Sequence, residues 1–170
     1  MMSPEKRVFL LVNVLGGLAV LASYALWLAN PSHDGEALWG SIAGAGRTAY
    51  TASMLAATAG YFTFAPWILR LDPARVRLTT LNACFTLILF PSALWMPLAF
   101  EYLDAPGPAV WWTMRITLGV VGVASAVLVG LLARIAPAPP GRAVAVAGAL
   151  AFTVQTLLLD AIVWPLCFPR

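Results

Sequence analysis

Four charged residues lie within or at the ends of long apolar stretches, where a charge is costly. Arg115 and Asp160 interrupt two of these stretches. Arg47 begins a third stretch, and Glu101 ends a fourth. A charged side chain inside a bilayer costs about 2.5–3.5 kcal/mol on insertion scales, so it usually pairs with another charge or faces a cavity. We therefore expect Arg115 to pair with Asp160, with Arg47 or Glu101 as a second partner.

This cluster of charges has two interpretations. In the first, the four side chains line a polar pocket that opens to the outer side of the membrane and binds a charged or hydrogen-bonding group of a ligand. In the second, Arg115 and Asp160 form a buried ion pair that holds two helices in register and has no further role. The sequence leaves both interpretations open.

Tryptophans at the same depth would form the walls of such a pocket. Trp95, Trp111 and Trp164 lie near the same ends of their apolar stretches as the four charges. The faces of aromatic rings attract cations, so these side chains suit a flat or cationic ligand. Tryptophan also gathers at membrane interfaces because its ring is amphipathic, and this alternative needs no ligand.

Most catalytic and cofactor sites are excluded by the small number of suitable ligands. The chain has one histidine, His33, and two cysteines, Cys84 and Cys167, in separate stretches. A metal site needs several convergent ligands, and neither Cys-x-x-Cys nor His-x-x-His spacing occurs. We expect no metal ion, no cofactor and no catalytic residue. Asp160 or Glu101 acting as an acid or base would lack a nucleophile, so an enzyme ranks behind a binding protein.

The composition assigns the whole chain to a membrane. Of its 170 residues, 61% are hydrophobic and 10% are charged, and the mean hydropathy is +0.86. Soluble domains carry about 25% charged residues, and a globule of this size cannot bury so much apolar surface. The net charge of +3 is too small and too scattered for a surface that binds nucleic acid. The sequence therefore predicts an integral protein of the plasma or inner membrane, surrounded by the lipid bilayer.

Five apolar stretches are long enough to cross a bilayer as helices. A crossing helix needs about 20 mostly apolar residues to span about 30 Å of hydrocarbon. The breaks between the stretches are rich in proline, glycine and aspartate, which favour turns. The sequence predicts an all-α bundle of five transmembrane helices, in one domain over residues 1–170. The predicted spans cover about residues 8–30, 47–69, 78–100, 109–133 and 143–168.

The basic residues predict the orientation of the chain. With the N-terminus inside, the inner ends of the spans hold seven of the ten basic residues: Lys6, Arg7, Arg70, Arg75, Arg77, Arg134 and Arg142. The outer ends hold the other three, Arg47, Arg115 and Arg170. Lys and Arg are in excess in the cytoplasmic loops of membrane proteins. We expect the N-terminus inside and the C-terminus outside.

These features favour a binding protein without catalytic activity. We expect a polytopic protein that binds or transports an amphipathic small molecule or a lipid at an outward-facing pocket within the membrane. The residues expected to contact this ligand are Arg47, Glu101, Arg115, Asp160, Trp95, Trp111 and Trp164. The alternative is an accessory or assembly subunit of a larger membrane complex, or a homodimer. In that case the ion pairs are structural, and faces of small residues dock on the partner.

Overall fold

The computed structural model describes residues 2–32 and 34–168, and these residues form helices and loops without any strand. Five helices are long and apolar enough to cross a membrane, as the sequence predicts. Four of them are continuous: α1 (Pro4–Leu28), α2 (Gly44–Arg70), α3 (Leu78–Asp104) and α4 (Pro108–Ala133). The fifth runs through α5 (Arg142–Thr153), the π-helix η3 (Val154–Val163) and α6 (Trp164–Cys167). His33 and Arg170 lie outside the described residues.

The predicted breaks carry residues that end one helix and begin the next. Proline occupies the first turn of α1 and of α4. A backbone N–H in the first turn has no partner within the helix, so the N–H that proline lacks costs no hydrogen bond. The carboxylate of Asp72 accepts a hydrogen bond of 3.0 Å from the backbone N–H of Ala74 and caps the short 3-10 helix η2 (Pro73–Arg75). A second 3-10 helix, η1 (Gly35–Trp39), lies between α1 and α2, where the sequence predicts no helix.

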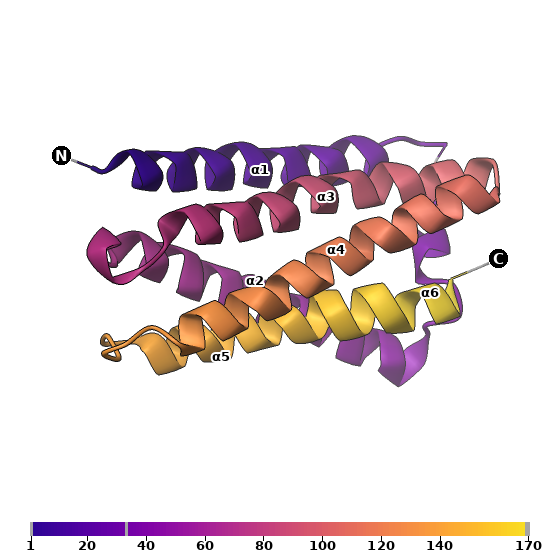
Figure 1. Ribbon diagram of the computed structural model, residues 1–170. Helices are drawn as coiled ribbons and strands as arrows, with labels where there is room; N and C mark the ends of the chain where they lie inside the picture. Colours follow the sequence, from indigo (N-terminus) through magenta and orange to yellow (C-terminus); the bar gives the residue numbers. More distant parts are fainter. Residues whose placement is uncertain (1, 33, 169–170) are drawn as a thin grey trace.

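The five long helices form a ring that is open on one side (Figure 1). α1 packs along α3, α3 along α4, α4 along α5 and η3, and α5 along α2. Contact between α1 and α2 would close the ring, but these two helices contact each other very little. The opening therefore lies between α1 and α2.

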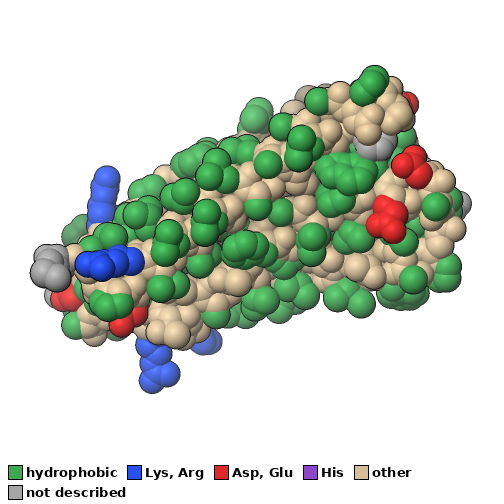
Figure 2. All heavy atoms as spheres, turned by 90° about the horizontal axis from the view of Figure 1, so that it is seen from above, with side chains coloured by type: hydrophobic (Ala, Val, Ile, Leu, Met, Phe, Trp, Pro, Cys, Tyr) green, Lys and Arg blue, Asp and Glu red, His purple; other side chains and the backbone are tan. Residues whose placement is uncertain are grey.

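The two ends of the bundle differ in charge. We define the N-terminal end as the one with residue 2, η2 and the loop at 134–141, and the C-terminal end as the one with η1, the loop at 105–107 and residue 168. On the face drawn in Figure 2, Lys and Arg side chains gather at the N-terminal end, acidic side chains lie at both ends, and the band between them is largely hydrophobic. Such a band suits contact with the hydrocarbon of a bilayer.

Glycines allow the closest approaches between helices. A methyl group added to Gly60 of α2 would overlap the carbonyl oxygen of Gly148 in α5. One added to Gly122 of α4 would lie 2.8 Å from the Cα atom of Leu157 in η3. Small residues at such crossings let helices pack by dispersion where lipid removes the hydrophobic driving force.

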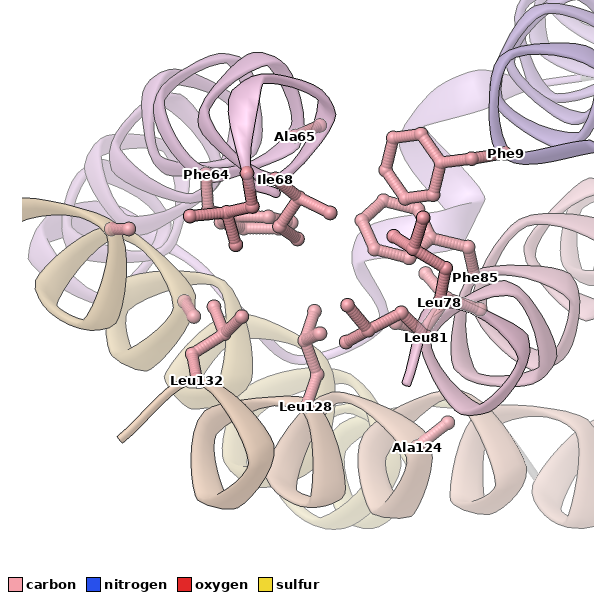
Figure 3. Packing of buried hydrophobic residues seen from close by; sticks show 14 of the residues in the cluster. Phe9, Phe64, Ala65, Ile68, Leu78, Leu81, Phe85, Ala124, Leu128 and Leu132 are labelled. Atoms are coloured by element: carbon pink, nitrogen blue, oxygen red, sulfur yellow. The ribbon is translucent and has the colours of Figure 1, made fainter. Parts of the chain in front are cut away.

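Two hydrophobic clusters fill the inside of the ring, one toward each end. Figure 3 shows the cluster toward the N-terminal end, where side chains from α1, α2, α3 and α4 converge. Phe85 is buried there, with the ring centroids of Phe9 and Phe64 at 4.7 and 6.0 Å from its own. The cluster toward the C-terminal end includes Met96, Phe100, Met114, Trp164 and Phe168. Beside this second cluster the packing leaves a cavity.

Candidate functional site

The cavity has a volume of about 480 Å³ and lies inside the ring, toward the C-terminal end. All five long helices contribute to its walls, together with η1. The walls are mostly apolar, and their aromatic side chains are Tyr24, Trp39, Tyr50, Trp95, Phe152 and Trp164. The volume falls in the usual range of small-molecule sites, about 300–1,000 Å³.

Asp160 is the only charged side chain among the described residues that line the cavity. Its Oδ1 atom accepts a hydrogen bond from the hydroxyl of Tyr50 in α2 and another, of 2.8 Å, from Nε2 of Gln155 in η3. Both donors are neutral. They hold the carboxylate in place without a counter-charge from the described residues of the cavity wall.

The ion pair expected between Arg115 and Asp160 is not formed, so this expectation is wrong. Asp160 takes the two neutral partners described above. Arg115 instead lies near the rings of Trp111 and Trp112, with its Cζ atom 5.9 and 5.8 Å from their centroids. The physical reason is helical spacing, because residues three and four positions apart share one face of α4. Arg115, Trp111 and Trp112 are not among the residues that line the cavity, to which α4 contributes Leu118 and Val121.

The π-helix η3 brings Gln155 and Asp160 together. In an α-helix, residues five positions apart are separated by roughly 140° around the axis, so their side chains diverge. In a π-helix the backbone hydrogen bonds join residues five positions apart, which places such residues nearly above one another. Gln155 and Asp160 have this separation, and both line the cavity. π-helical turns are frequent at functional sites.

Two further polar atoms at the cavity have no hydrogen-bond partner among the described residues. They are Oε1 of Gln155 and Nε1 of Trp95, and both are buried. Gln155 is 5% exposed, so solvent around the protein does not reach its free carbonyl oxygen. An unpaired buried donor or acceptor costs about 1–3 kcal/mol, and in native structures it calls for an explanation such as a bound molecule or water. The cavity thus offers an acceptor, a donor and a carboxylate.

The helix η1 covers the cavity at the C-terminal end and is fastened on two sides. On one side, Nε1 of Trp164 donates a hydrogen bond of 2.7 Å to the carbonyl oxygen of Leu38. On the other side, Arg47 donates to both carboxylate oxygens of Glu36, at 2.5 and 2.7 Å. The guanidinium of Arg47 also lies 4.4 Å from the ring centroid of Trp39. These hydrogen bonds from Arg47 lower the pKa of the Glu36 carboxyl.

Of the seven residues expected at the site, three line the cavity and four lie elsewhere. The three are Asp160, Trp95 and Trp164. The four are Arg47, Arg115, Glu101 and Trp111. Glu101 is exposed on α3, and Trp111 stacks on Phe168 with their ring centroids 6.5 Å apart. Residues at the same depth in different helices meet only if their helical faces also point toward each other.

The set of site residues predicted from the sequence lacks three polar side chains that line the cavity: Tyr24, Tyr50 and Gln155. Gln155 could have been noticed as an uncharged polar residue inside an apolar stretch, five positions before Asp160. Tyr50 could have been noticed only as one of several aromatic residues at the same depth. No spacing in the sequence links α2 to the helix that carries Asp160.

The arrangement suits non-covalent recognition of a small molecule. Apolar walls can hold a hydrocarbon part, while Asp160, Gln155 and Trp95 can hold a polar part. Among the described residues, no three His, Cys, Asp or Glu side chains are grouped so that they could hold a metal ion. Comparison of the chain with protein-family models, curated proteins and solved structures finds no match.

Proposed function

We propose that this chain is a multi-pass membrane protein that binds an amphipathic small molecule or a lipid inside its helix bundle. The observation that carries the proposal is the cavity, in which a carboxylate and two unpaired buried polar atoms lie among apolar and aromatic walls. A purely structural polar cluster would satisfy its own hydrogen bonds. The unpaired atoms of Gln155 and Trp95 therefore favour a site that receives a ligand.

The apolar and the polar residues of the cavity wall would bind different parts of the ligand. The hydrocarbon part of the ligand would pack against apolar side chains such as Met54, Met96 and Leu118. The polar part would contact Asp160 and Gln155, which the hydrogen bond between them holds in fixed relative positions. Fixed partners lower the cost of ordering the site when the ligand binds. Transport would need a further change in the bundle, for which the open side between α1 and α2 is the natural place.

The orientation proposed with this function places the N-terminus inside and the C-terminus outside. It is supported by the seven basic residues that the sequence places toward the N-terminal end of the bundle, and by the Lys and Arg side chains that gather at that end on the face drawn in Figure 2. With this orientation the cavity lies in the outer half of the membrane.

Native mass spectrometry of the protein released from lipid nanodiscs tests the binding proposal. Ala57 of α2 is buried in the cavity wall, and the adjacent Ala56 is exposed on the same helix. Ala57→Phe should fill part of the cavity and remove a molecule that the wild type retains, whereas Ala56→Phe should retain it. Thr58→Trp, at the exposed rim of the cavity, is a second blocking variant in case Ala57→Phe does not fold. Circular dichroism and size-exclusion chromatography check the folding of each variant.

Two results would contradict the binding proposal. One is a wild-type protein that carries no molecule other than loosely attached lipid. The other is a molecule that stays bound in folded Ala57→Phe and Thr58→Trp. A second protein that co-purifies with the wild type in a fixed ratio, without a small molecule, would support an accessory subunit instead.

A further inference from the structure

We propose that the ligand is a long-chain amine, which binds as its ammonium ion against Asp160 and reaches the cavity sideways from the bilayer, through the opening between α1 and α2. The proposal rests on the binding function proposed above. It adds the chemical class of the ligand and its path. Three features of the described residues support it: the position of the exposed rim, the closure of the C-terminal end, and the chemistry of the walls.

The exposed rim of the cavity lies on two helices. Four of the lining residues are exposed, Leu21 and Leu28 on α1 and Met54 and Thr58 on α2. Leu21 is 69% exposed and Met54 is 38% exposed. α1 and α2 contact each other very little. The hydrogen bond that the Tyr61 hydroxyl donates to Oδ1 of Asn13 joins the two helices toward the N-terminal end, and beside the cavity the described residues leave the ring open between them. The opening therefore faces the side of the bundle, toward lipid.

The C-terminal end of the cavity is covered. Leu38 of η1 is 8% exposed in the cavity wall, and Gly35 and Trp39 are partly buried. The hydrogen bonds from Trp164 and Arg47 fasten η1 across this end. A ligand arriving from water would have to displace η1, whereas a ligand dissolved in the bilayer meets the lateral opening directly. The pocket expected to face outward thus becomes one that faces lipid.

The polar groups of the walls favour an ammonium ion. Asp160 supplies a negative charge, and both of its hydrogen-bond donors are neutral. The unpaired Oε1 atom of Gln155, on a side chain that is 5% exposed, supplies a further acceptor. An ammonium group carries donors only, so it can satisfy both acceptors at once. A fatty acid would instead place a second carboxylate beside Asp160, which repulsion disfavours.

The aromatic walls favour the same ion. The ring centroids of Trp95 and Trp164 lie 5.5 Å apart, and those of Tyr24 and Trp95 lie 5.7 Å apart, so these rings form a continuous wall. Aromatic faces attract cations, and most strongly in a desolvated site. Nε1 of Trp95 remains as a buried donor for an oxygen atom close to the ammonium group. The apolar rim at Leu21 and Met54 suits the hydrocarbon chain.

Three probes with the same hydrocarbon chain separate the effect of charge from that of chain length. They are dodecylamine, dodecanol and dodecanoic acid, each titrated into the protein in nanodiscs of zwitterionic lipid. The bound fraction is measured by native mass spectrometry. We expect dodecylamine to bind about tenfold more tightly than either of the other two, as charge-assisted hydrogen bonds exceed neutral ones.

Substitutions at Asp160 and Gln155 test the role of the acceptors. Asp160→Asn keeps the shape of the side chain and removes its charge, and it should weaken dodecylamine binding about tenfold while dodecanol binding changes by less than about twofold. Glu101→Gln removes an acidic charge from an exposed position of α3 and should leave dodecylamine binding unchanged. Gln155→Leu removes the further acceptor and tests the proposal independently if Asp160→Asn does not fold.

The rate of binding tests the path. Leu21→Trp combined with Met54→Trp narrows the opening and should slow the association of dodecylamine. Leu26→Trp combined with Leu55→Trp places the same bulk on the same helices, at residues that are 72% and 68% exposed and lie outside the cavity wall, and should not slow it. Glu36→Gln, which loosens η1, should leave the rate unchanged. Faster association in Glu36→Gln, with no effect of the paired tryptophans at the opening, would overturn the lateral path.

The outcomes for the probes distinguish this inference from the proposed function. Equal binding of all three probes, lost for each of them in Ala57→Phe, would overturn the amine and leave a general binding cavity in place. Binding that is the same in wild type and in folded Ala57→Phe would overturn both. Preferential binding of dodecylamine that Asp160→Asn abolishes would support both.

Discussion

At the scale of single residues, the position of the Asp160 carboxylate depends on the hydroxyl of Tyr50. Tyr50→Phe keeps the ring packing in place and removes one of the two donors to that carboxylate. We expect the free energy of unfolding to fall by about 1 kcal/mol, the usual size of one net hydrogen bond. Reversible unfolding in mixed micelles measures the change.

A matched control for Tyr50→Phe is Tyr102→Phe. Tyr102 is also buried, at 8% exposure, but its hydroxyl has no hydrogen bond to the described residues. Its loss should change the free energy of unfolding much less. If Tyr50→Phe and Tyr102→Phe are equally stable, the Tyr50 hydroxyl does not hold Asp160 in the folded protein.

The ion pair between Arg47 and Glu36 makes the attachment of η1 dependent on pH. The hydrogen bonds from Arg47 lower the pKa of Glu36, which lies outside the predicted spans. A carboxyl whose pKa is lower in the folded state than in the unfolded state adds stability above the unfolded value, and that stability is lost as the pH falls through the folded value. We therefore expect the melting temperature of the wild type to approach that of Glu36→Gln as the pH is lowered from neutral.

Thermal unfolding in nanodiscs, followed by circular dichroism over this pH series, measures the difference between the two proteins. Both residues are exposed, at 39% for Arg47 and 68% for Glu36, so the effect is small and high salt should reduce it. A difference in melting temperature that stays constant from neutral to acidic pH would show that Glu36 acts through packing and not through its charge.

At the scale of helices, the crossing of α2 and α5 depends on the absence of side chains. Gly60 and Gly148 bring the two backbones so close that a methyl group on Gly60 has no room. Gly60→Ala should therefore force the helices apart and lower the free energy of unfolding by about 1–3 kcal/mol, the usual cost of overpacking. Gly46→Ala in the same helix meets open space and should not lower it. If Gly60→Ala and Gly46→Ala have the same free energy of unfolding, α2 and α5 do not cross closely at Gly60.

The helices were predictable from the sequence, but the partners of Asp160 were not. Bilayer thickness sets a minimum length for an apolar run, and proline and glycine mark the breaks, so composition alone locates five helices. Helical periodicity assumes 3.6 residues per turn, so it places Gln155 away from the face of Asp160. The π-helix η3 changes that geometry, and no proline lies within residues 154–163 to indicate the change.

The contacts between helices could likewise not be predicted from the sequence. The sequence predicts an ion pair between Arg115 and Asp160 because both lie at the same depth in the membrane. Which helical faces meet, however, depends on the order of the helices around the ring. Tyr50 reaches Asp160 because α2 packs along α5 and η3. The helix η1 was missed because five residues are too few to show periodicity, so the cover over the cavity was unforeseen.

At the scale of the whole molecule, the half of the membrane that holds the cavity depends on which end of the bundle lies inside. The basic residues at the N-terminal end favour the inside for that end. The cavity and its cover η1 then belong to the outer half of the membrane. If the orientation were reversed, a ligand in the inner leaflet would have the shorter path to the opening.

Cysteine labelling in intact cells decides the orientation. In a background with Cys84→Ser and Cys167→Ser, Ala74→Cys places a thiol in the exposed η2 at the N-terminal end, and Ala105→Cys places one in the exposed loop after α3. A membrane-impermeant maleimide should label Ala105→Cys in intact cells and Ala74→Cys only after the cells are opened. Labelling of Ala74→Cys in intact cells would reverse the orientation, since two loops separated by one membrane-spanning helix cannot lie on the same side.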